Sequence, residues 1–363
     1  MHATRADLRC SSLAPRPAAL CGWDIGGAHL KAVGLDSRGG FLWACQAATA
    51  LWQGLDTLQC ALRQVRGWLA PETLHVLTLT GEGADCFPDR ASGVHTLLDL
   101  WQGEFAAARA WVYAGVGGLH PLAANDPERL AEAGSRNHLA TAELCARLGG
   151  VGILADMGSS TTDFTLLRSD GVHAMALDDA GRLATGELVY QGLTRTPLVA
   201  LGPRVPFDGH WQPLMNEHFA TSADIHRLLG QLDESCDLHP AADAASKTLL
   251  DSARRLARML GRDLDSAPLP AWQQLAGWFA WRQRCILAES LCQLASREPR
   301  ALAGGLIATG VGSGVLAAVA RDLGLATRGF AELAGEATVA PWVDRCAPAY
   351  ACARLRALTP SHS

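Results

Sequence analysis

The sequence predicts an α/β protein with two lobes. Its 363 residues exceed the size at which a single hydrophobic core usually stops growing. Apolar residues make up 49% of the chain and charged residues 18%, which favours a packed globular interior. A pattern of strand, aspartate, glycine-containing turn and returning strand occurs at residues 19–44 and again, imperfectly, at 151–177. Because an internal repeat indicates a repeated unit of structure, this pattern predicts two related lobes that each begin with a β-hairpin.

Residues 19–150 are predicted to form the first lobe, after a flexible leader at residues 1–18 that lacks the apolar stretch of a secretory signal. Apolar runs between turn residues predict strands, and apolar residues at helical spacing predict helices. In chain order these are strand 19–25, strand 41–48, helix 52–69, strand 74–80, helix 91–108, strand 110–115 and helix 137–150. The sequence "DSRGG" at 36–40 predicts a tight turn, so the lobe is expected to begin as a β-meander.

Residues 151–363 are predicted to form the second lobe. It begins with the repeated hairpin at 151–177, which a loop-rich region follows. Two segments with helical character, at 243–261 and 270–296, are assigned to a helical insertion that spans about residues 215–296. A strand, a glycine-rich turn and a helix follow at 304–324.

The composition argues against several classes of function. A net charge of −5 and an isoelectric point near 6.2 do not suit a nucleic-acid-binding protein. No apolar run is long enough to cross a membrane, so no membrane partner is expected. The eleven cysteines are scattered and form no CxxC pair, which is typical of reduced residues in a cytoplasmic protein. The oligomeric state cannot be predicted from these properties.

The first hairpin carries the sequence "DIGGAHLK" at residues 24–31, here called turn 1. Gly26 and Gly27 allow backbone N–H groups to approach an anion, because no Cβ stands in the way. Lys31 supplies a positive charge for a phosphate, and Asp24, at the end of a strand, can hold Mg²⁺ directly or through water. By itself the motif is equally consistent with an ordinary hairpin that has a lysine on its surface.

The second hairpin carries "DMGSSTTD" at residues 156–163, here called turn 2. Its Asp156 is the counterpart of Asp24 and a second candidate for the metal. The donors of the turn are Gly158, Ser159, Ser160 and Thr161. Turns rich in serine and threonine often bond only to themselves. Two such turns, each preceded by an aspartate at a strand end, nevertheless favour a phosphate clamp more strongly than either does alone.

A third glycine-rich element, "ATGVGSG" at residues 308–314, lies between a strand and a helix and is here called turn 3. Gly310, Gly312 and Ser313 would place backbone N–H groups at the start of that helix, where anions bind. The glycine spacing does not match the fingerprint of a dinucleotide-binding fold. Turn 3 is therefore a candidate for contact with a phosphate or with the edge of a nucleotide.

The order of the three turns resembles that of the actin-like ATPase superfamily, which has a ribonuclease H-like fold. The resemblance implies two lobes with mixed central sheets and a phosphate-binding cleft between them. It also implies that turns 1 and 2 are phosphate loops and that the element at 304–324 faces adenosine.

Further stretches narrow this resemblance. "GWDIGGAHLK", "TGEGADCFPDR", "DMGSSTTDF" and "GELVYQGLTRTP" are together similar to the hydantoinase/oxoprolinase-like family linked to the tetrahydromethanopterin C1 pathway. Archaeal members of that family act in methanofuran biosynthesis. The resemblance implies a transferase that joins an aminomethylfuran-methyl diphosphate to the phenol of γ-glutamyltyramine, or of a tyramine analogue, and releases diphosphate.

The candidate site residues follow from this chemistry. A protonated phenol is a poor nucleophile, so a base is expected. Glu82 and Asp85 are the first candidates and Asp163 is a lesser one, while His29 could also serve, although a histidine in a turn is as often a plain hydrogen-bonding residue. Lys31 would stabilise the leaving group. Five further residues are candidates for substrate binding: His29, Asp89, Arg90, Glu187 and Arg195. The stretch around Asp89 can equally be the capped start of a helix beside a solvated charge cluster, and the stretch around Glu187 an ordinary loop with one ion pair.

The expected partners are therefore small molecules, namely the furan diphosphate and a tyramine-type phenol. Mg²⁺ is the expected cofactor, and ATP is not expected to be required. Two alternatives remain at this point. One is an ATP-dependent small-molecule kinase, because this fold often transfers the γ-phosphoryl group. The other is a non-catalytic nucleotide-binding protein.

Overall fold

The computed structural model describes residues 7–12, 16–106, 108–122 and 130–359. Its first sheet has the strand order β1-β4-β3-β2-β5-β6-β7. β2 is antiparallel to β3, β3 is antiparallel to β4, and β5 and β6 run parallel to β2. The strands are β1 (Leu8–Cys10), β2 (Leu20–Gly26), β3 (His29–Leu35), β4 (Phe41–Ala48), β5 (Leu74–Thr80), β6 (Ala110–Tyr113) and β7 (Leu119–Pro121).

The second sheet has the order β10-β9-β8-β14-β15, and the short strand β11 pairs with β9. β8 is antiparallel to β9 and β9 to β10, whereas β14 runs parallel to both β8 and β15. The strands are β8 (Gly152–Met157), β9 (Thr162–Arg168), β10 (Gly171–His173), β11 (Leu188–Val189), β14 (Leu306–Thr309) and β15 (Thr327–Gly329).

The two sheets repeat one arrangement, which confirms the predicted fold class. The order β4-β3-β2-β5-β6 and the order β10-β9-β8-β14-β15 have the same strand directions, with an antiparallel meander on one side and parallel strands on the other. This is the duplicated, mixed-sheet arrangement of the actin-like ATPase fold. Because β2 and β8 occupy equivalent places, the hairpins that carry turns 1 and 2 are equivalent too.

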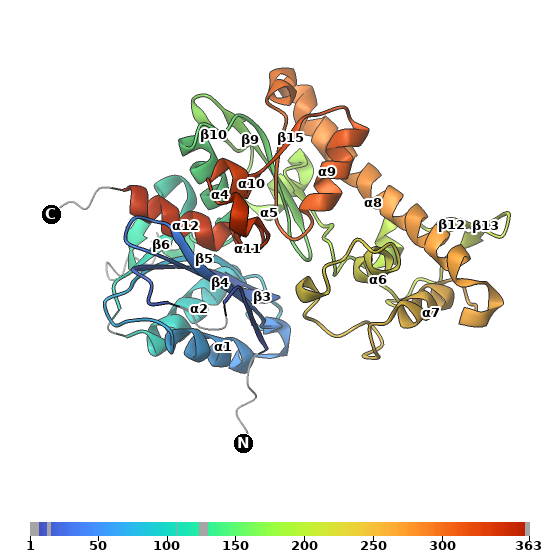
Figure 1. The fold of residues 1–363 in the computed structure, drawn as a ribbon, viewed down its shortest axis with the longest axis horizontal. Helices are drawn as coiled ribbons and strands as arrows, with labels where there is room; N and C mark the ends of the chain where they lie inside the picture. The colour runs from blue at the N-terminus through green and yellow to red at the C-terminus, as the bar shows by residue number, and fades with distance from the viewer. Residues whose placement is uncertain (1–6, 13–15, 107, 123–129, 360–363) are drawn as a thin grey trace.

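Helices cover both faces of the first sheet and join it to the second (Figure 1). α1 (Asp56–Arg66) and α2 (Arg90–Glu104) pack in one apolar core, while α4 (Asn137–Arg147) and α12 (Ala347–Leu358) pack in another that also includes residues of the second sheet. α12 lies directly across β2, since a Cβ built on Gly22 would overlap the backbone oxygen of Ala349. The two lobes therefore share a continuous core rather than a flexible linker.

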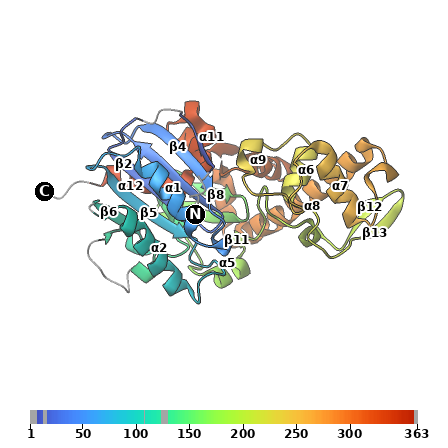
Figure 2. The same cartoon turned by 90° about the horizontal axis from the view of Figure 1, so that it is seen from below.

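The insertion of the second lobe forms an arm that extends to one side of the molecule in both views (Figures 1 and 2). It has its own apolar core around Trp272 and Phe279. Its elements are β12 (Arg204–Phe207), β13 (His210–Pro213), α6 (Ser222–Leu228), α7 (Leu249–Met259) and the first part of α8 (Leu269–Arg297). Although α8 has 29 residues, none of the helices in the described ranges is both long and apolar enough to cross a membrane.

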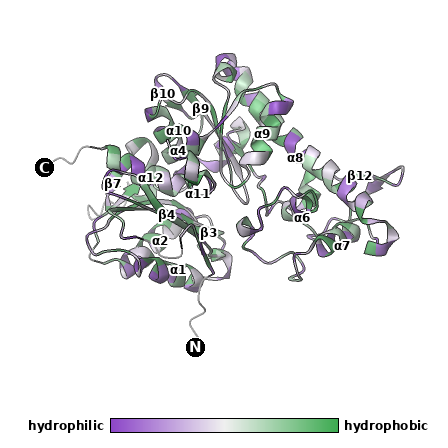
Figure 3. Cartoon of the chain, viewed as in Figure 1, coloured by the Kyte–Doolittle hydropathy of each residue, from purple (hydrophilic) through white to green (hydrophobic). Residues whose placement is uncertain are grey.

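The remaining helices belong to the second lobe and to its return toward the first. They are α5 (Asp179–Thr185), α9 (Ser313–Asp322), α10 (Phe330–Leu333) and α11 (Ala340–Arg345). The mostly apolar α9, which stands out as hydrophobic in Figure 3, packs against α8 and β14.

The structure differs from the expected boundaries at three places. Leu8–Cys10, expected within a flexible leader, form β1 and pair with β4. The arm begins before residue 215, because the β12–β13 hairpin packs within it. The C-terminal helix α12 packs on the first sheet although its sequence lies in the predicted second lobe. Each difference arises from tertiary pairing, which local sequence patterns do not specify.

Candidate active site

Turn 1 places a lysine and an aspartate side by side on neighbouring strands. The β2–β3 register pairs Asp24 with Lys31, and the Lys31 Nζ lies 3.4 Å from Oδ2 of Asp24. Thr80, at the end of β5, donates a hydrogen bond to Oδ1 of Asp24 at 3.4 Å. Burial raises the pKa of Asp24, and Lys31 opposes this effect. The lysine therefore lies near the tip of the hairpin, mostly buried, instead of on an open surface.

Turn 2 brings a second carboxylate, that of Asp156, toward the same lysine. The β8–β9 register pairs Asp156 with Asp163, and Asp163 is held by an ion pair with the buried Arg182. Burial raises the pKa of Asp156 to about 7; Lys31 counteracts this effect, and the negative charges of Asp163 and Asp24 add to it. Burial opposes the charge of Lys31 as well, but the attraction of Asp24 and Asp156 leaves its pKa raised.

The two strand-end carboxylates beside Lys31, Asp24 and Asp156, fit a divalent cation bound through few direct ligands. Lys31 balances only one of these two negative charges, so a cation would offset the other, whereas Asp163 is already paired with Arg182. Among the described residues, no three His, Cys, Asp or Glu side chains are arranged to hold a metal ion by themselves. Mg²⁺ commonly takes one or two carboxylates and fills its other positions with water and phosphate oxygens. Asp24 and Asp156 can supply those carboxylates.

The backbone of both turns offers donors for an anion. The amides of Gly27, Ser159 and Ser160 make no hydrogen bond to any other described residue. Gly81 packs closely against turn 1, since a Cβ added to it would lie only 3.2 Å from the Gly27 nitrogen. The carbonyl of Ser159, in contrast, accepts hydrogen bonds from the segment 194–195, which fixes turn 2 in place. These features are those that a phosphate clamp needs.

Turn 3 packs against turn 2, and this explains its first two glycines. Gly310 has φ +84°, and a Cβ there would overlap the carboxylate of Asp156. A Cβ on Gly312 would overlap the side chain of Met157, and the amide of Gly312 donates to the Met157 carbonyl at 2.9 Å. Ser313 begins α9 directly after this turn. Gly310 and Gly312 therefore bring β14 and α9 close to the second hairpin, and the Gly312 amide is already occupied.

A cavity of about 340 Å³ lies beside turn 3, between α9 and the helices α6 and α8. His226, on its wall, is hydrogen-bonded through both ring nitrogens, to Gln231 at 3.1 Å and to Gln283 at 2.9 Å. The wall consists of Leu193, His226, Gln231, Ala280, Arg284, Val311, Gly312, Gly314, Val315, Ala318 and Arg321. Its mixture of small apolar residues and two arginines at the edge suits an organic group of moderate size.

A second group of polar side chains lies next to the turns. The Nδ1 of His29 is 3.4 Å from Oγ of Ser159, so this histidine of turn 1 reaches turn 2. Arg195 donates to Oγ of Ser160 at 2.9 Å and lies over the ring of Trp52, 4.4 Å from its centroid. His239 stands edge-on to His29, with 4.7 Å between the ring centroids. Two predicted substrate-binding residues, His29 and Arg195, are thus brought together at the turns.

The arm supplies His239 to this group through a loop that charged pairs hold in place. His239 donates from Nε2 to the carbonyl of Ala28 at 3.0 Å. On one side of it, Arg227 is paired with Glu234 at 2.8 Å and with Asp237 at 2.6 Å. On the other side, the fully buried Arg255 is paired with Asp243 at 3.0 Å. The loop at residues 231–247 is therefore fixed to the arm and spans to turn 1.

Arg345, at the end of α11, joins the same loop to the centre of the molecule. It donates to Asp233 and Ser235, both at 2.9 Å, while its Nε and Nη1 atoms are buried and have no partner among the described residues. Its charge acts on His29 and on Cys236. Arg345 therefore brings unused donors into the neighbourhood of turn 1.

Glu82, a predicted base, lies in a different group of contacts. Its Oε1 accepts hydrogen bonds from Ser135 at 2.6 Å and from Arg90 at 3.3 Å, while Oε2 is buried and has no partner among the described residues. Burial raises its pKa, and the hydrogen bond from Ser135 opposes that effect. Arg90 also pairs with Asp179 of the second lobe. The Glu82–Arg90–Asp179 chain thus connects the two lobes.

Of the other candidates from the sequence, Asp89 and Glu187 make hydrogen bonds that hold local structure. Asp85 is exposed and no hydrogen bond or ion pair is found for it within the described ranges. Asp89 caps α2 by accepting from the amide of Ser92 at 2.7 Å, which is the alternative that the sequence had left open. The buried Glu187 accepts from the amides of Met175 and Ala176, at 2.7 and 3.1 Å, and so holds the loop after β10.

Three residues of the site were not selected from the sequence. Trp52 lies in a 3-10 helix (Leu51–Gln53) at the start of the helix predicted at 52–69, and His239 lies in a loop. Arg345 ends α11, the third α-helix after turn 3. The only indication of His239 in the sequence is that a histidine stands in the acidic, proline-containing segment "CDLHPAADA". For Arg345 the sequence offers no comparable signal.

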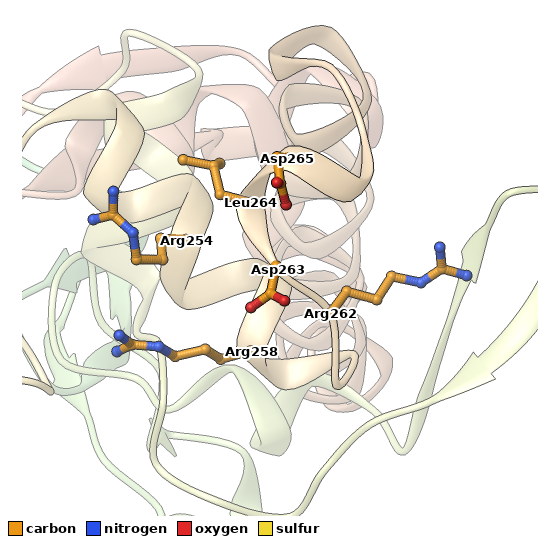
Figure 4. A pocket seen from close by; sticks show the side chains of 6 residues that line it. All are labelled: Arg254, Arg258, Arg262, Asp263, Leu264 and Asp265. Carbon is orange, nitrogen blue, oxygen red and sulfur yellow. The ribbon is translucent and has the colours of Figure 1, made fainter.

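A further pocket, of about 280 Å³, opens on the arm, away from these turns (Figure 4). Arg254 and Arg258 extend along one side of it, while Arg262 points the other way (Figure 4) and stacks over Phe207 at 5.0 Å. Arg254 and Arg258 are each paired with an aspartate of the arm. These arginines are thus engaged within the arm.

Two curated archaeal proteins are similar to this chain in sequence. Both bear the name (4-{4-[2-(gamma-L-glutamylamino)ethyl]phenoxymethyl}furan-2-yl)methanamine synthase. The protein of Methanocaldococcus jannaschii is 29% identical over 245 residues, which cover 67% of this chain and 72% of that protein. The protein of Methanococcus vannielii is 37% identical over 116 residues, which cover 31% of this chain and half of that protein. No model of a known protein family matches the chain.

Solved structures resemble the chain more distantly. Component A of the (R)-2-hydroxyglutaryl-CoA dehydratase of Acidaminococcus fermentans is 11% identical, with a TM-score of 0.46 over 93% of this chain and 96% of that one. A nucleotide-free acetone carboxylase is 10% identical, with a TM-score of 0.48 over 93% of this chain and 70% of that one. The fold assignment rests on the duplicated strand order. The sequence similarity itself is to the two proteins that bear this synthase name.

Proposed function

We propose that the protein is a transferase of methanofuran-type cofactor biosynthesis that acts in the cytoplasm. It joins an aminomethylfuran-methyl diphosphate to the phenol of γ-glutamyltyramine, or of a tyramine analogue, and releases diphosphate. The name of the two archaeal relatives describes a product with a phenoxymethyl-furan ether, which this reaction forms. The single structural observation that supports the proposal is the convergence of turns 1 and 2 on Lys31.

The reaction divides into departure of the diphosphate and attack by the phenol. The furan ring delocalises positive charge that develops on the methylene carbon, so the main task of the protein is to stabilise the departing anion. Lys31 and the amides of Gly27, Ser159 and Ser160 provide fixed positive groups for it. When bound at Asp24 and Asp156, Mg²⁺ would neutralise part of the diphosphate charge.

A direct assay tests the proposal. Purified protein is incubated with the furan diphosphate, γ-glutamyltyramine and Mg²⁺ without ATP, and the ether product and released diphosphate are measured together. The expected result is ether and diphosphate in equal amounts. A strict requirement for ATP, with ADP formed in place of diphosphate, contradicts the proposal.

The cavity beside turn 3 supports a second candidate, an ATP-dependent small-molecule kinase. Its volume of about 340 Å³ and its position between α9 and the arm suit the adenosine of a nucleotide whose phosphates reach the two hairpins. Phosphorylation of a hydroxyl substrate at the expense of ATP would select this candidate. Binding of nucleotide without turnover of any substrate would indicate a non-catalytic nucleotide-binding protein.

A further inference from the structure

His29 has one ring nitrogen that the fold leaves without a partner. The side chain is only 5% exposed, and its Nε2 is buried without a hydrogen bond to any other described residue. A buried polar atom without a hydrogen-bond partner is costly, and a catalytic role or a bound molecule is one explanation for it. The position at the tip of turn 1, facing turn 2, places this atom where the two lobes meet.

The other nitrogen of His29 sets the chemical character of Nε2. Nδ1 is 3.4 Å from Oγ of Ser159. If the Nδ1–H donates to this hydroxyl, Nε2 carries the lone pair and can accept a proton. Burial, followed by the positive charges around it, lowers the pKa of His29 well below its usual value, so the ring is neutral at physiological pH.

Aromatic groups and one cation lie next to His29 on the side of the arm, beginning with His239, whose ring contacts that of His29. Trp52 is 39% exposed, a large open fraction for a tryptophan, and lies 5.5 Å from His239 between ring centroids. Arg195 covers part of the Trp52 ring. A phenyl ring packs well against such edges and faces.

We propose that His29 takes the proton from the acceptor's phenol, and that Trp52, His239 and Arg195 form the subsite for its aromatic ring. This proposal rests on the transferase function proposed above and deepens it. A lone pair of the phenol oxygen forms the new bond to the furanylmethyl carbon. The bond from that carbon to the diphosphate oxygen breaks, and its electron pair leaves with the diphosphate. The phenolic proton passes to Nε2 of His29 and from there to water.

The charges around His29 couple this step to the binding of the other substrate. The positive groups that disfavour its protonated form include Lys31, which the proposed function assigns to the diphosphate. A bound diphosphate would neutralise these groups, so His29 would become a stronger base only after the leaving group is in place. The charged groups that act on His29 or on His239 are Lys31, Arg195, Arg345, Asp237 and Lys247.

His239 is a positioning residue in this arrangement. It donates to the carbonyl of Ala28, which directly precedes His29, and its ring packs edge-on against His29. Glu82, the base expected from the sequence, is instead held by Ser135 and Arg90, and its hydrogen bonds and ion pairs among the described residues do not include either turn. The geometry therefore favours His29 over Glu82.

The test compares two acceptors on wild type and on His29→Asn. One acceptor is γ-glutamyltyramine, and the other is a ring-fluorinated analogue whose phenol is already ionised at the assay pH. The variant is expected to lose about 100-fold or more in kcat with the first acceptor, which is the usual contribution of a general base. It should lose far less with the second, because no proton has to be removed. His210→Asn, at an exposed position of β13, is the matched control and should behave as wild type.

Several outcomes separate the proposals. Binding of Mg²⁺-diphosphate to His29→Asn, measured by calorimetry, confirms that the variant is folded and that the clamp is intact; His29→Gln replaces it if it does not fold. Equal losses with both acceptors, or near-normal kcat with γ-glutamyltyramine, would overturn the role of His29. Loss of phenol turnover in Glu82→Gln alone would assign the base to Glu82. If wild type forms no ether with either acceptor, the proposed function fails and this proposal fails with it.

Discussion

The Nζ of Lys31 lies 3.4 Å from the carboxylate of Asp24, on the neighbouring strand of the first hairpin, while Asp156 of the second hairpin acts on the same lysine. Lys31 is thus the residue on which both lobes converge. The proposed reaction depends on this relationship.

Lys31→Met should reduce diphosphate release about 100-fold or more, because the fixed charge that stabilises the leaving group is lost. Affinity for Mg²⁺-diphosphate, measured by calorimetry, should fall as well. The matched control is Lys247→Met, since Lys247 is paired with Asp237 of the loop and not with either hairpin. Equal affinity for diphosphate in Lys31→Met and wild type would contradict the assignment of Lys31 to the clamp.

The raised pKa of Asp156 predicts a pH-dependent stability. The pKa of Asp156 is about 7 in the folded protein and near 3.8 in the unfolded chain, so the folded state binds the proton more tightly. The stabilisation that this bound proton gives the folded state is therefore lost as the pH rises from about 4 to 7. The loss amounts to at most about 4 kcal/mol. Urea unfolding of the metal-free protein at several pH values measures it, and Asp156→Asn should flatten the profile over that interval. An unchanged slope in this variant would assign the dependence to other groups.

Two roles of Arg345 can be tested separately: fastening the loop of the arm, and supplying a positive charge near turn 1. Asp233→Asn removes one partner of Arg345 and should increase hydrogen exchange in the loop 231–247, with Arg345 itself still present. Arg345→Met should increase this exchange too and, in addition, weaken binding of Mg²⁺-diphosphate, because two buried donors near turn 1 are lost. If both variants bind diphosphate as wild type does, Arg345 only fastens the loop.

A glycine substitution tests the crossing of α12 and β2. Gly22→Ala should lower the free energy of unfolding by about 1–3 kcal/mol or more, because the new methyl group would overlap the backbone of Ala349. Gly103→Ala is the control, since no atom lies near its Cβ in the helix α2, and it should stabilise the protein by about 0.5–1 kcal/mol. Chemical denaturation of both variants measures the difference. Equal stability of the two would contradict the close approach of α12.

The sequence predicted the repeat of the fold but not the way the lobes are joined. Asp24 and Asp156 stand at equivalent strand ends, so a local pattern was enough to pair their hairpins. The position of α12 on the first sheet could not be predicted, because an apolar helix pattern does not specify the surface that it covers.

The candidate site was predictable where its residues lie in the turns and not where they come from elsewhere. Lys31, His29 and Ser159 follow from the two motifs. Trp52 and His239 enter by tertiary contact, through a connecting segment and through a loop of the arm. The sequence left two roles open for Asp89, because a helix cap and a ligand carboxylate look the same in a sequence, and the structure shows the cap.

The crossing of α12 over Gly22 also bears on how the chain folds during synthesis. β2, β3 and β5 emerge from the ribosome long before residues 347–358, yet one face of these strands is covered by that helix. The first lobe then remains incomplete, with an apolar face open, until residues 347–358 have been made. Nascent chains that stop before α12 should therefore expose this apolar face and recruit chaperones.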